Sequence, residues 1–168
     1  MSSIRNTRLS EGVEWGLHCA VLLAVMPPDA ALPTSRLAEF HGVPVAYLAK
    51  HLQAMSRAGI LVAGTGPRGG YQLARPAADV SVLDVVEAID GDDPAFQCLE
   101  IRRRGPTAVP AREYRTMCGI HRVMVEADAA WRERLAHTSV ADLAVGVARD
   151  ASPDAMEKFG TWFQEVTS

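Results

Sequence analysis

Four side chains of this chain have the types and spacing to bind a metal. Glu14 and His18 stand four positions apart in a stretch of helical pattern, so they share one face of that helix. Cys98 and Cys118 stand at the two ends of an irregular stretch. Thiolates and imidazoles bind zinc and iron–sulfur clusters. A lone cysteine is more often a buried apolar residue, and a Glu–His pair is more often a surface pair, so both interpretations stay open here.

The cysteine count argues against a secreted protein stabilised by disulfides. The chain has three cysteines, an odd number, and their spacing forms no disulfide framework. Cys19 lies close to the apolar stripe of the first helix and is expected to be buried. Glu11, Glu14 and His18 interrupt that helix, which excludes a signal peptide or a membrane span there. We expect a cytoplasmic, nucleoid-associated protein that binds no membrane.

A second group of residues, in the stretch 34–75, has the pattern of a DNA-binding element. Apolar residues at helical spacing predict two short helices on either side of Gly42, which is the helix-turn-helix pattern. Residues 60–62 and 71–73 flank the glycine-rich stretch 64–70 and predict a hairpin. A helix-turn-helix followed by a hairpin is a winged helix. The predicted fold is therefore mainly α with a small β-hairpin wing.

Charge is distributed unevenly along the chain. The whole sequence carries −3, which excludes a general polyanion binder. The stretch 34–75 has five basic residues against Glu39 alone, a balance of +4, so the remaining residues must sum to −7. A basic module on an acidic body is expected of a protein that contacts phosphates with one face. The five basic residues are Arg36, Lys50, Arg57, Arg68 and Arg75.

We expect the second helix of this module to read double-stranded operator DNA. Residues near its N-terminus would face the major groove, and later ones would lie nearer the phosphate backbone. Glycines around Arg68 allow a sharp turn or a close approach to DNA at the tip of the wing. A solvated helix in a protein–protein adaptor is the alternative. The predicted DNA-binding residues are Ser35, Val45, Ala46, Tyr47, Lys50, His51, Arg57, Arg68 and Gly69.

The remaining stretches predict further helices and a partner subunit. Helical patterns cover residues 10–26, 81–91, 119–135, 139–149 and a segment that starts near 152. Ser81 followed by Asp84 predicts a capping box at the start of the second of these helices. The expected buried side of the last helix is Met156, Phe159 and Phe163. The helix from Gly119 is amphipathic and too long for a winged helix to cover, so we expect a homodimer, which also suits palindromic operators. The predicted organisation is a winged helix-turn-helix domain (1–91), a loop (92–118), and a long dimerisation helix with C-terminal helices (119–168). The apolar stripe of the long helix is Ile120, Val123, Met124, Ala127, Trp131 and Leu135.

Several motifs in residues 10–145 are shared with one group of regulators. They are Leu37-Ala38-Glu39, Tyr47-Leu48, Ala58-Gly59-Ile60-Leu61, Gly66-Pro67-Arg68-Gly69-Gly70-Tyr71, Leu73-Ala74-Arg75-Pro76 and Asp84-Val85-Val86-Glu87-Ala88-Ile89-Asp90-Gly91. With these motifs the chain resembles the IscR-type (Rrf2) family of bacterial winged-helix transcriptional regulators, and the glycine-rich wing is the most specific of them. The resemblance implies a homodimer, in many members with an iron–sulfur cluster next to the dimerisation helix.

A second set of motifs resembles an actinobacterial branch of this family that senses redox state. They are Glu14-Trp15-x-Leu17-His18, Pro94-Ala95-Phe96-x-Cys98, Glu100-Ile101-Arg102-x-Arg104-Gly105-Pro106 and Cys118. In that branch a [2Fe–2S] cluster bridges two subunits. The resemblance implies that Cys98 and Cys118 of one chain, with Glu14 and His18 of its mate, are the metal ligands.

The chain also departs from the common family pattern. That pattern has three cysteines close together in the loop, whereas here two cysteines flank the loop and Tyr114 stands where another cysteine is expected. This difference argues against a three-cysteine cluster. His121 is a possible substitute ligand, with a surface role as its alternative. Trp15, adjacent to Glu14, is our candidate for a redox relay to the recognition helix, with core filler as its alternative.

Together these features predict a transcriptional regulator, in the simplest case a repressor, that senses redox or nitrosative stress through a [2Fe–2S] cluster at the homodimer interface. The alternative is a cluster-free winged-helix regulator whose cysteines are structural or act as redox thiols. We expect no enzyme activity. The sequence offers no nucleophile–base arrangement, and its wing glycines lie between strands and open no helix, so they form no phosphate-binding loop.

Overall fold

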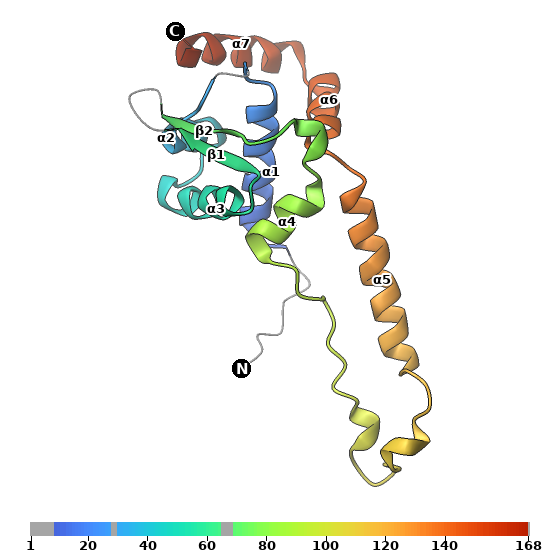
Figure 1. Ribbon diagram of the computed structural model, residues 1–168. Helices are drawn as coiled ribbons and strands as arrows, with labels where there is room; N and C mark the ends of the chain where they lie inside the picture. Colours follow the sequence, from blue (N-terminus) through green and yellow to red (C-terminus); the bar gives the residue numbers. More distant parts are fainter. Residues whose placement is uncertain (1–8, 28–29, 65–68, 168) are drawn as a thin grey trace.

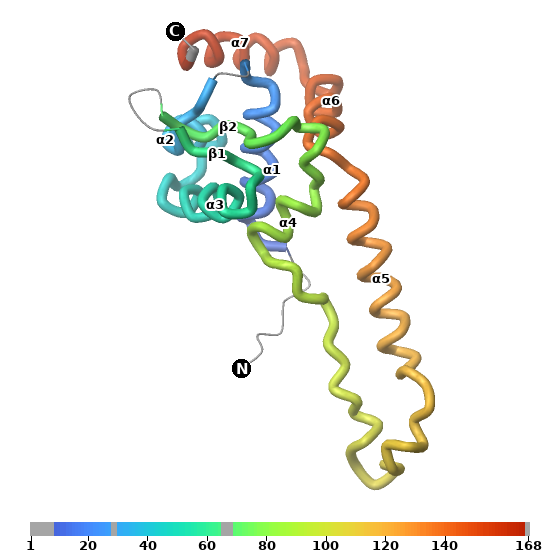
Figure 2. The backbone as a smooth tube through the Cα atoms, viewed as in Figure 1, coloured from blue at the N-terminus to red at the C-terminus, as the bar shows by residue number. Residues whose placement is uncertain are grey.

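The computed structural model describes residues 9–27, 30–64 and 69–167, which form a body with a long arm (Figure 1). The central helix of the body is α1 (Glu11–Ala24). The arm consists of the extended stretch after α4 and the helix α5 (Gly119–Ala136), which returns toward the body, as the chain trace in Figure 2 shows. The described part of the chain is therefore mainly helical with one small hairpin, as the sequence predicts.

The predicted helix-turn-helix is confirmed. It consists of α2 (Thr34–His41) and α3 (Val45–Arg57). Gly42 ends α2 in the left-handed conformation, with φ of 63°, which a residue with a side chain rarely adopts. Leu48 and Leu52 of α3 are fully buried, so the opposite face of this helix is left in solvent.

The predicted wing is also confirmed, and it is tied to the chain before α2. Strands β1 (Leu61–Gly64) and β2 (Gly70–Leu73) pair antiparallel, with Leu61 opposite Leu73 and Gly64 opposite Gly70. The backbone N–H of Leu32 donates to the Tyr71 carbonyl at 3.0 Å, and the Tyr71 N–H donates back to the Leu32 carbonyl at 2.8 Å. This bridge fixes the root of the wing beside the helix-turn-helix.

Replacing Gly70 with Ala is expected to destabilise the protein by roughly 1–3 kcal/mol, because the new methyl group has no space. A Cβ at Gly70 would lie 2.6 Å from Pro33 N and closer still to the Leu32 carbonyl group. These are backbone atoms, which cannot rotate away. Gly64→Ala is the matched control on the opposite strand, where the nearest atom lies 3.8 Å away. Urea unfolding of both variants checks this; equal loss in the two would contradict the close approach.

Most of the body packs around α1. Helices α2, α3, α4 (Val82–Asp90) and α6 (Val140–Asp150) all contact it. Gly16 permits part of this packing, since a Cβ there would lie 2.5 Å from Ile89 Cδ1 of α4. The predicted capping box at the start of α4 is present: the Asp84 N–H donates to Ser81 Oγ at 3.0 Å, and the Ser81 N–H donates to Asp84 Oδ2 at 2.9 Å. Fully buried core side chains include Cys19, Leu32, Leu37, Leu48, Leu52, Met55, Ile60, Val80, Val85 and Val140.

The C-terminal helices fold back onto the winged helix and do not follow the arm. Val140 at the start of α6 is fully buried in the main core, and α7 (Pro153–Thr167) lies across one end of the body (Figure 1). The predicted buried side of this last helix is partly wrong. Phe159 and Phe163 pack against the core as expected, but Met156 is 49% exposed. Trp162 also packs against the core, with its ring centre 4.5 Å from that of Phe40. Met156 is exposed because it lies at the edge of a cavity between α1, α2, α6 and α7.

The arm exposes an apolar helix. None of the 18 described residues of α5 is buried in this single chain. Ile120, Val123 and Trp131 of the predicted stripe are 68%, 59% and 41% exposed. Toward its C-terminal end α5 contacts the body, where Arg132 forms an ion pair with Glu87 of α4. None of the described helices is both long and apolar enough to cross a membrane.

Candidate metal site and DNA-binding surface

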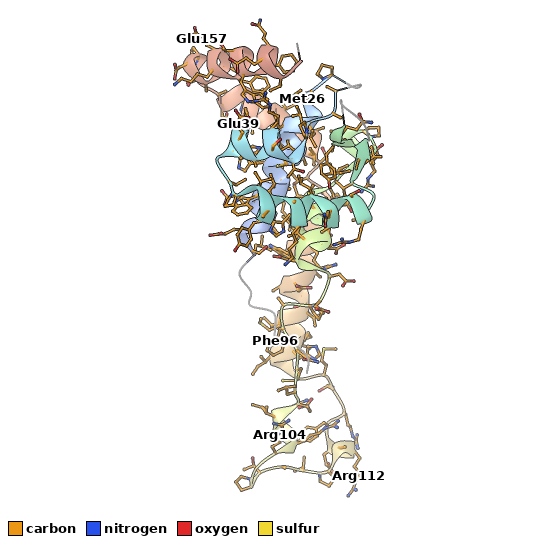
Figure 3. All side chains as sticks on the ribbon, turned by 90° about the vertical axis from the view of Figure 1, so that its left-hand side faces the viewer. Met26, Glu39, Phe96, Arg104, Arg112 and Glu157 are labelled. Atoms are coloured by element: carbon orange, nitrogen blue, oxygen red, sulfur yellow. The ribbon has the colours of Figure 1, made fainter. Side chains whose placement is uncertain are left out.

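The stretch between α4 and α5 holds Cys98 and Cys118 through a small network of contacts. Figure 3 shows Phe96, Arg104 and Arg112 successively farther from the body along this stretch. The backbone N–H of Glu100 donates to Cys98 Sγ at 3.4 Å. Arg102 forms an ion pair with the Glu100 carboxylate and lies 4.8 Å over the ring of Tyr114. The loop therefore has an ordered conformation that keeps its two thiols half-buried.

Cys118 immediately precedes α5, and this position changes its acidity. The backbone N–H groups of His121 and Ile120 lower the pKa of the Cys118 thiol, and the nearby positive charge of Arg102 lowers it further. A thiol at a helix N-terminus is stabilised as the thiolate by the unpaired N–H groups there. The thiolate is the form that binds metals and reacts with oxidants. Cys118 is thus chemically suited to either role considered from the sequence.

Cys19 has the opposite environment. It belongs to α1, and its side chain is fully buried in the core, which raises the pKa of its thiol to about 12. A protonated, enclosed thiol neither binds a metal nor meets an oxidant. The expectation that Cys19 is a core residue is confirmed.

Glu14 and His18 are both exposed on α1, one helical turn apart, as their spacing predicts. They face a cavity of about 800 Å³ between α1 and α6, whose wall also includes Leu17 and Leu143. The His18 ring lies 5.7 Å from the ring of His41 on α2. Burial, and secondly the charge of His18, lowers the pKa of His41 to about 4, so His41 is neutral near pH 7.

The four predicted ligands lie in two separate places in one chain. Cys98 and Cys118 both lie in the arm, and Glu14 and His18 stand one helical turn apart on the body. The two pairs are separated by α5, whose 18 residues span roughly 27 Å. Among the described residues, no three His, Cys, Asp or Glu side chains are placed to hold a metal ion.

Trp15 lies between the candidate ligands and the recognition helix. Its ring meets that of His51 on α3 edge-on, with 6.0 Å between the ring centres. The His51 ring also fills the space above Gly12, where a Cβ would lie 2.6 Å from its Nδ1. Burial and then the charge of Lys50 lower the pKa of His51. His51, which we expect near the DNA backbone, thus also touches α1.

Most of the other predicted DNA-binding residues in the described part of the chain are exposed on the helix-turn-helix. Val45 and Tyr47 at the start of α3 are 48% and 65% exposed. Ser35, Ala46, Lys50 and Arg57 are exposed as well, and Gly69 is half-buried at the wing. Arg68 lies outside the described residues.

Two of the basic residues in this module are engaged with acidic side chains. Arg36 pairs with Glu39 at 2.8 Å, and Arg75 pairs with Asp84 at 3.0 Å. The positive charge available on α3 therefore comes from Lys50 and Arg57. The role of Arg102 was not predicted from the sequence. Its only signal there was its place in a shared motif, because an ion pair within an irregular loop leaves no periodic pattern.

Comparisons with known proteins agree on one family. The family Rrf2, described as an iron-dependent transcriptional regulator, matches residues 9–146. Protein rrf2 of Nitratidesulfovibrio vulgaris is 28% identical over 145 residues, which is 86% of this chain and 89% of that protein. CymR, the global cysteine regulator of B. subtilis, superimposes with a TM-score of 0.64 at 18% identity, covering 83% of this chain and 98% of CymR. IscR of T. potens superimposes with a TM-score of 0.65 at 18% identity, covering 88% of this chain and 93% of that IscR. At this identity the two structures establish the fold alone.

Proposed function

Since this chain belongs to the Rrf2 family of DNA-binding transcriptional regulators, we propose that it is a redox-responsive regulator, in the simplest case a repressor, with [2Fe–2S] clusters at its homodimer interface. The observation that carries the proposal is the division of the four candidate ligands into a thiol pair on the arm and a glutamate–histidine pair on the body. Among the described residues, neither pair is joined within its own chain by enough further His, Cys, Asp or Glu side chains to hold a metal ion. Each pair therefore requires a second copy of the chain.

The homodimer follows from the arm. An 18-residue helix with Ile120, Val123 and Trp131 exposed is costly in water, since each apolar side chain gains about 1.5–3 kcal/mol when it is fully buried. A symmetric pair of such helices covers both stripes at once. It also carries the thiols of each chain toward the body of its mate. The open cavity beside Glu14 and His18 offers room for the incoming loop.

The residues present fit a mixed-ligand cluster. The backbone N–H groups that lower the pKa of Cys118 favour its thiolate. Arg102 pairs with the carboxylate of Glu100, whose backbone N–H donates to Cys98 Sγ. Glu14 and His18 are exposed and one turn apart on α1, so both side chains can bind the same iron atom. The cluster, when bound, supplies one-electron redox chemistry, and histidine ligation raises its potential above the all-cysteine value.

The proposed DNA contacts follow from exposure on α3. Tyr47 and Lys50 stand on the solvent face near the N-terminus of this helix, which enters the major groove in helix-turn-helix proteins. Arg57 lies near its C-terminal end. Because Arg36 and Arg75 are paired with acids, Lys50 and Arg57 are the candidates for phosphate contact, and Tyr47 is the candidate for a base contact.

The proposal is tested by a spectrum of anaerobically purified protein before and after dithionite, with operator binding measured in both states. We expect a visible absorption band that bleaches, an S = 1/2 EPR signal on reduction, and a changed operator affinity. A colourless protein without iron that binds its operator normally would favour the cluster-free regulator. The lowered pKa of Cys118 supports that alternative through thiol oxidation.

Replacing Trp15 with Phe is expected to reduce the difference in operator affinity between oxidised and reduced protein. Trp15 neighbours Glu14 and contacts His51 on α3, so it is placed to transmit a change at the ligands to the recognition helix. Phe keeps an apolar ring but is smaller and lacks the indole N–H. Fluorescence anisotropy with operator DNA in both redox states checks this. An unchanged difference would mean that Trp15 is core filler.

A further inference from the structure

The end of the body covered by α7 contains a second cavity, of about 350 Å³, enclosed by α1, α2, α6 and α7. In Figure 3, Glu39 marks α2 and Glu157 marks α7, which lies above it. The segment α7 lies beyond residues 9–146, the part that matches the family. The cavity is therefore built partly by a helix outside the region shared with the family.

The walls of this cavity are apolar. Phe40 of α2, Val147 of α6, and Met156 and Phe159 of α7 form much of the surface. Val147 and Met156 at its edge are 54% and 49% exposed. None of the described lining residues is Lys, Arg, Asp or Glu. A charged ligand would lose its hydration here without gaining a paired charge, so the walls favour a neutral molecule.

Two imidazoles provide the polar groups of the cavity, and one of them has an unsatisfied atom. His41 lines the cavity, and its Nε2 is enclosed yet has no hydrogen-bond partner among the described residues. A buried polar atom without a partner costs about 1–3 kcal/mol, so such atoms are rare unless a ligand or water satisfies them. The His41 ring is held edge-on against Phe40, with ring centres 4.9 Å apart.

We propose that this cavity binds a small neutral molecule with an aromatic or alicyclic body and one hydroxyl or N–H group that hydrogen-bonds to His41. The volume lies at the lower end of the range for ligand pockets, and an apolar surface with a small number of polar groups is their usual composition. Phe40 and His41 belong to the first helix of the helix-turn-helix, so the ligand would contact the DNA-binding module directly. The site does not depend on a cluster, although His18 borders both.

The test uses the full-length dimer and three probes that differ in one group: 1-naphthol, naphthalene and 1-naphthoate. Isothermal titration calorimetry is expected to show 1-naphthol binding with a Kd on the order of 10–100 μM, naphthalene binding more weakly, and no binding of 1-naphthoate. His41→Phe keeps the ring but removes Nε2. It is expected to weaken 1-naphthol binding about five-fold and leave naphthalene unchanged.

Filling the cavity provides the second arm of the test. Ala144→Leu adds a side chain from α6 into the cavity and is expected to weaken both neutral probes at least about ten-fold. Val145→Leu, at the neighbouring position that is 68% exposed, is the matched control and should bind as wild type. If Ala144→Leu fails to fold, Ala148→Leu, also on the lining, replaces it.

Three results would overturn the proposal. The first is the absence of binding by 1-naphthol, which would mean that water or a segment of the partner chain fills the cavity. The second is binding that the filling variants leave intact, and the third is tight binding of 1-naphthoate. The titration is repeated with protein stripped of iron. If the protein proves to have no cluster, the binding measurement still tests the cavity.

Discussion

Replacing Cys118 with Ala is expected to remove iron from the purified protein and to abolish any redox dependence of operator binding. Wild type should carry about two iron atoms per chain, the content of one [2Fe–2S] cluster for each subunit. The backbone N–H groups at the start of α5 and the charge of Arg102 favour the thiolate of Cys118. Alanine has no group that can bind iron, so the variant loses this ligand. Iron and sulfide assays with an absorption spectrum measure the loss.

Cys19→Ala is the matched control for this variant. It also removes one thiol, but from the core, where burial raises the thiol pKa to about 12. It should keep its iron and lose only some thermal stability. Wild-type iron content in Cys118→Ala would contradict the proposed ligand set. His121, one turn into α5, would then be the first substitute ligand to examine.

The local structure followed closely from the sequence where a periodic pattern or a capping residue was present. The helical spacing predicted α1 to α7, Gly42 predicted the turn, and Ser81 with Asp84 predicted the capping box. These features depend on neighbours within a few residues. The glycine-rich stretch predicted the wing for the same reason.

Contacts between side chains of different elements could not be predicted from the sequence. The Arg75–Asp84 pair removes one expected phosphate contact, and the Trp15–His51 contact joins helices that are far apart in sequence. Met156 has the helical spacing of a buried residue, but the position at which α7 crosses the body leaves it at the edge of a cavity. Amphipathic spacing identifies an apolar face without saying what covers it.

The candidate metal site was predictable in part. The four-residue spacing placed Glu14 and His18 on one face of α1 and in solvent. The pairing of Cys98 with Cys118 came from a family resemblance, because the loop between them has no periodicity. How the loop holds them, through Glu100, Arg102 and Tyr114, required the structure. In the proposed dimer, the thiols of one chain and the Glu14–His18 pair of the other form one site. A single chain therefore shows the two pairs apart from each other.

This division into halves leads to a complementation experiment with a large expected effect. One variant lacks both thiols (Cys98→Ala with Cys118→Ala), and the other lacks both body ligands (Glu14→Ala with His18→Ala). Each variant alone is expected to purify without iron. The heterodimer of the two keeps one complete set of four ligands if ligands are shared between chains, because the thiols of the second variant meet the Glu14 and His18 of the first. Its other site lacks all four.

The purified heterodimer, isolated with two different tags after co-expression, is therefore expected to contain about half of the wild-type iron and the same EPR signal. If each chain instead held a cluster with its own four ligands, every site in the heterodimer would lack two of them, and no iron would be retained. Wild-type chains carrying the same two tags give the full-occupancy control. Since α5, roughly 27 Å long, lies between the two ligand pairs in one chain, we expect the shared arrangement.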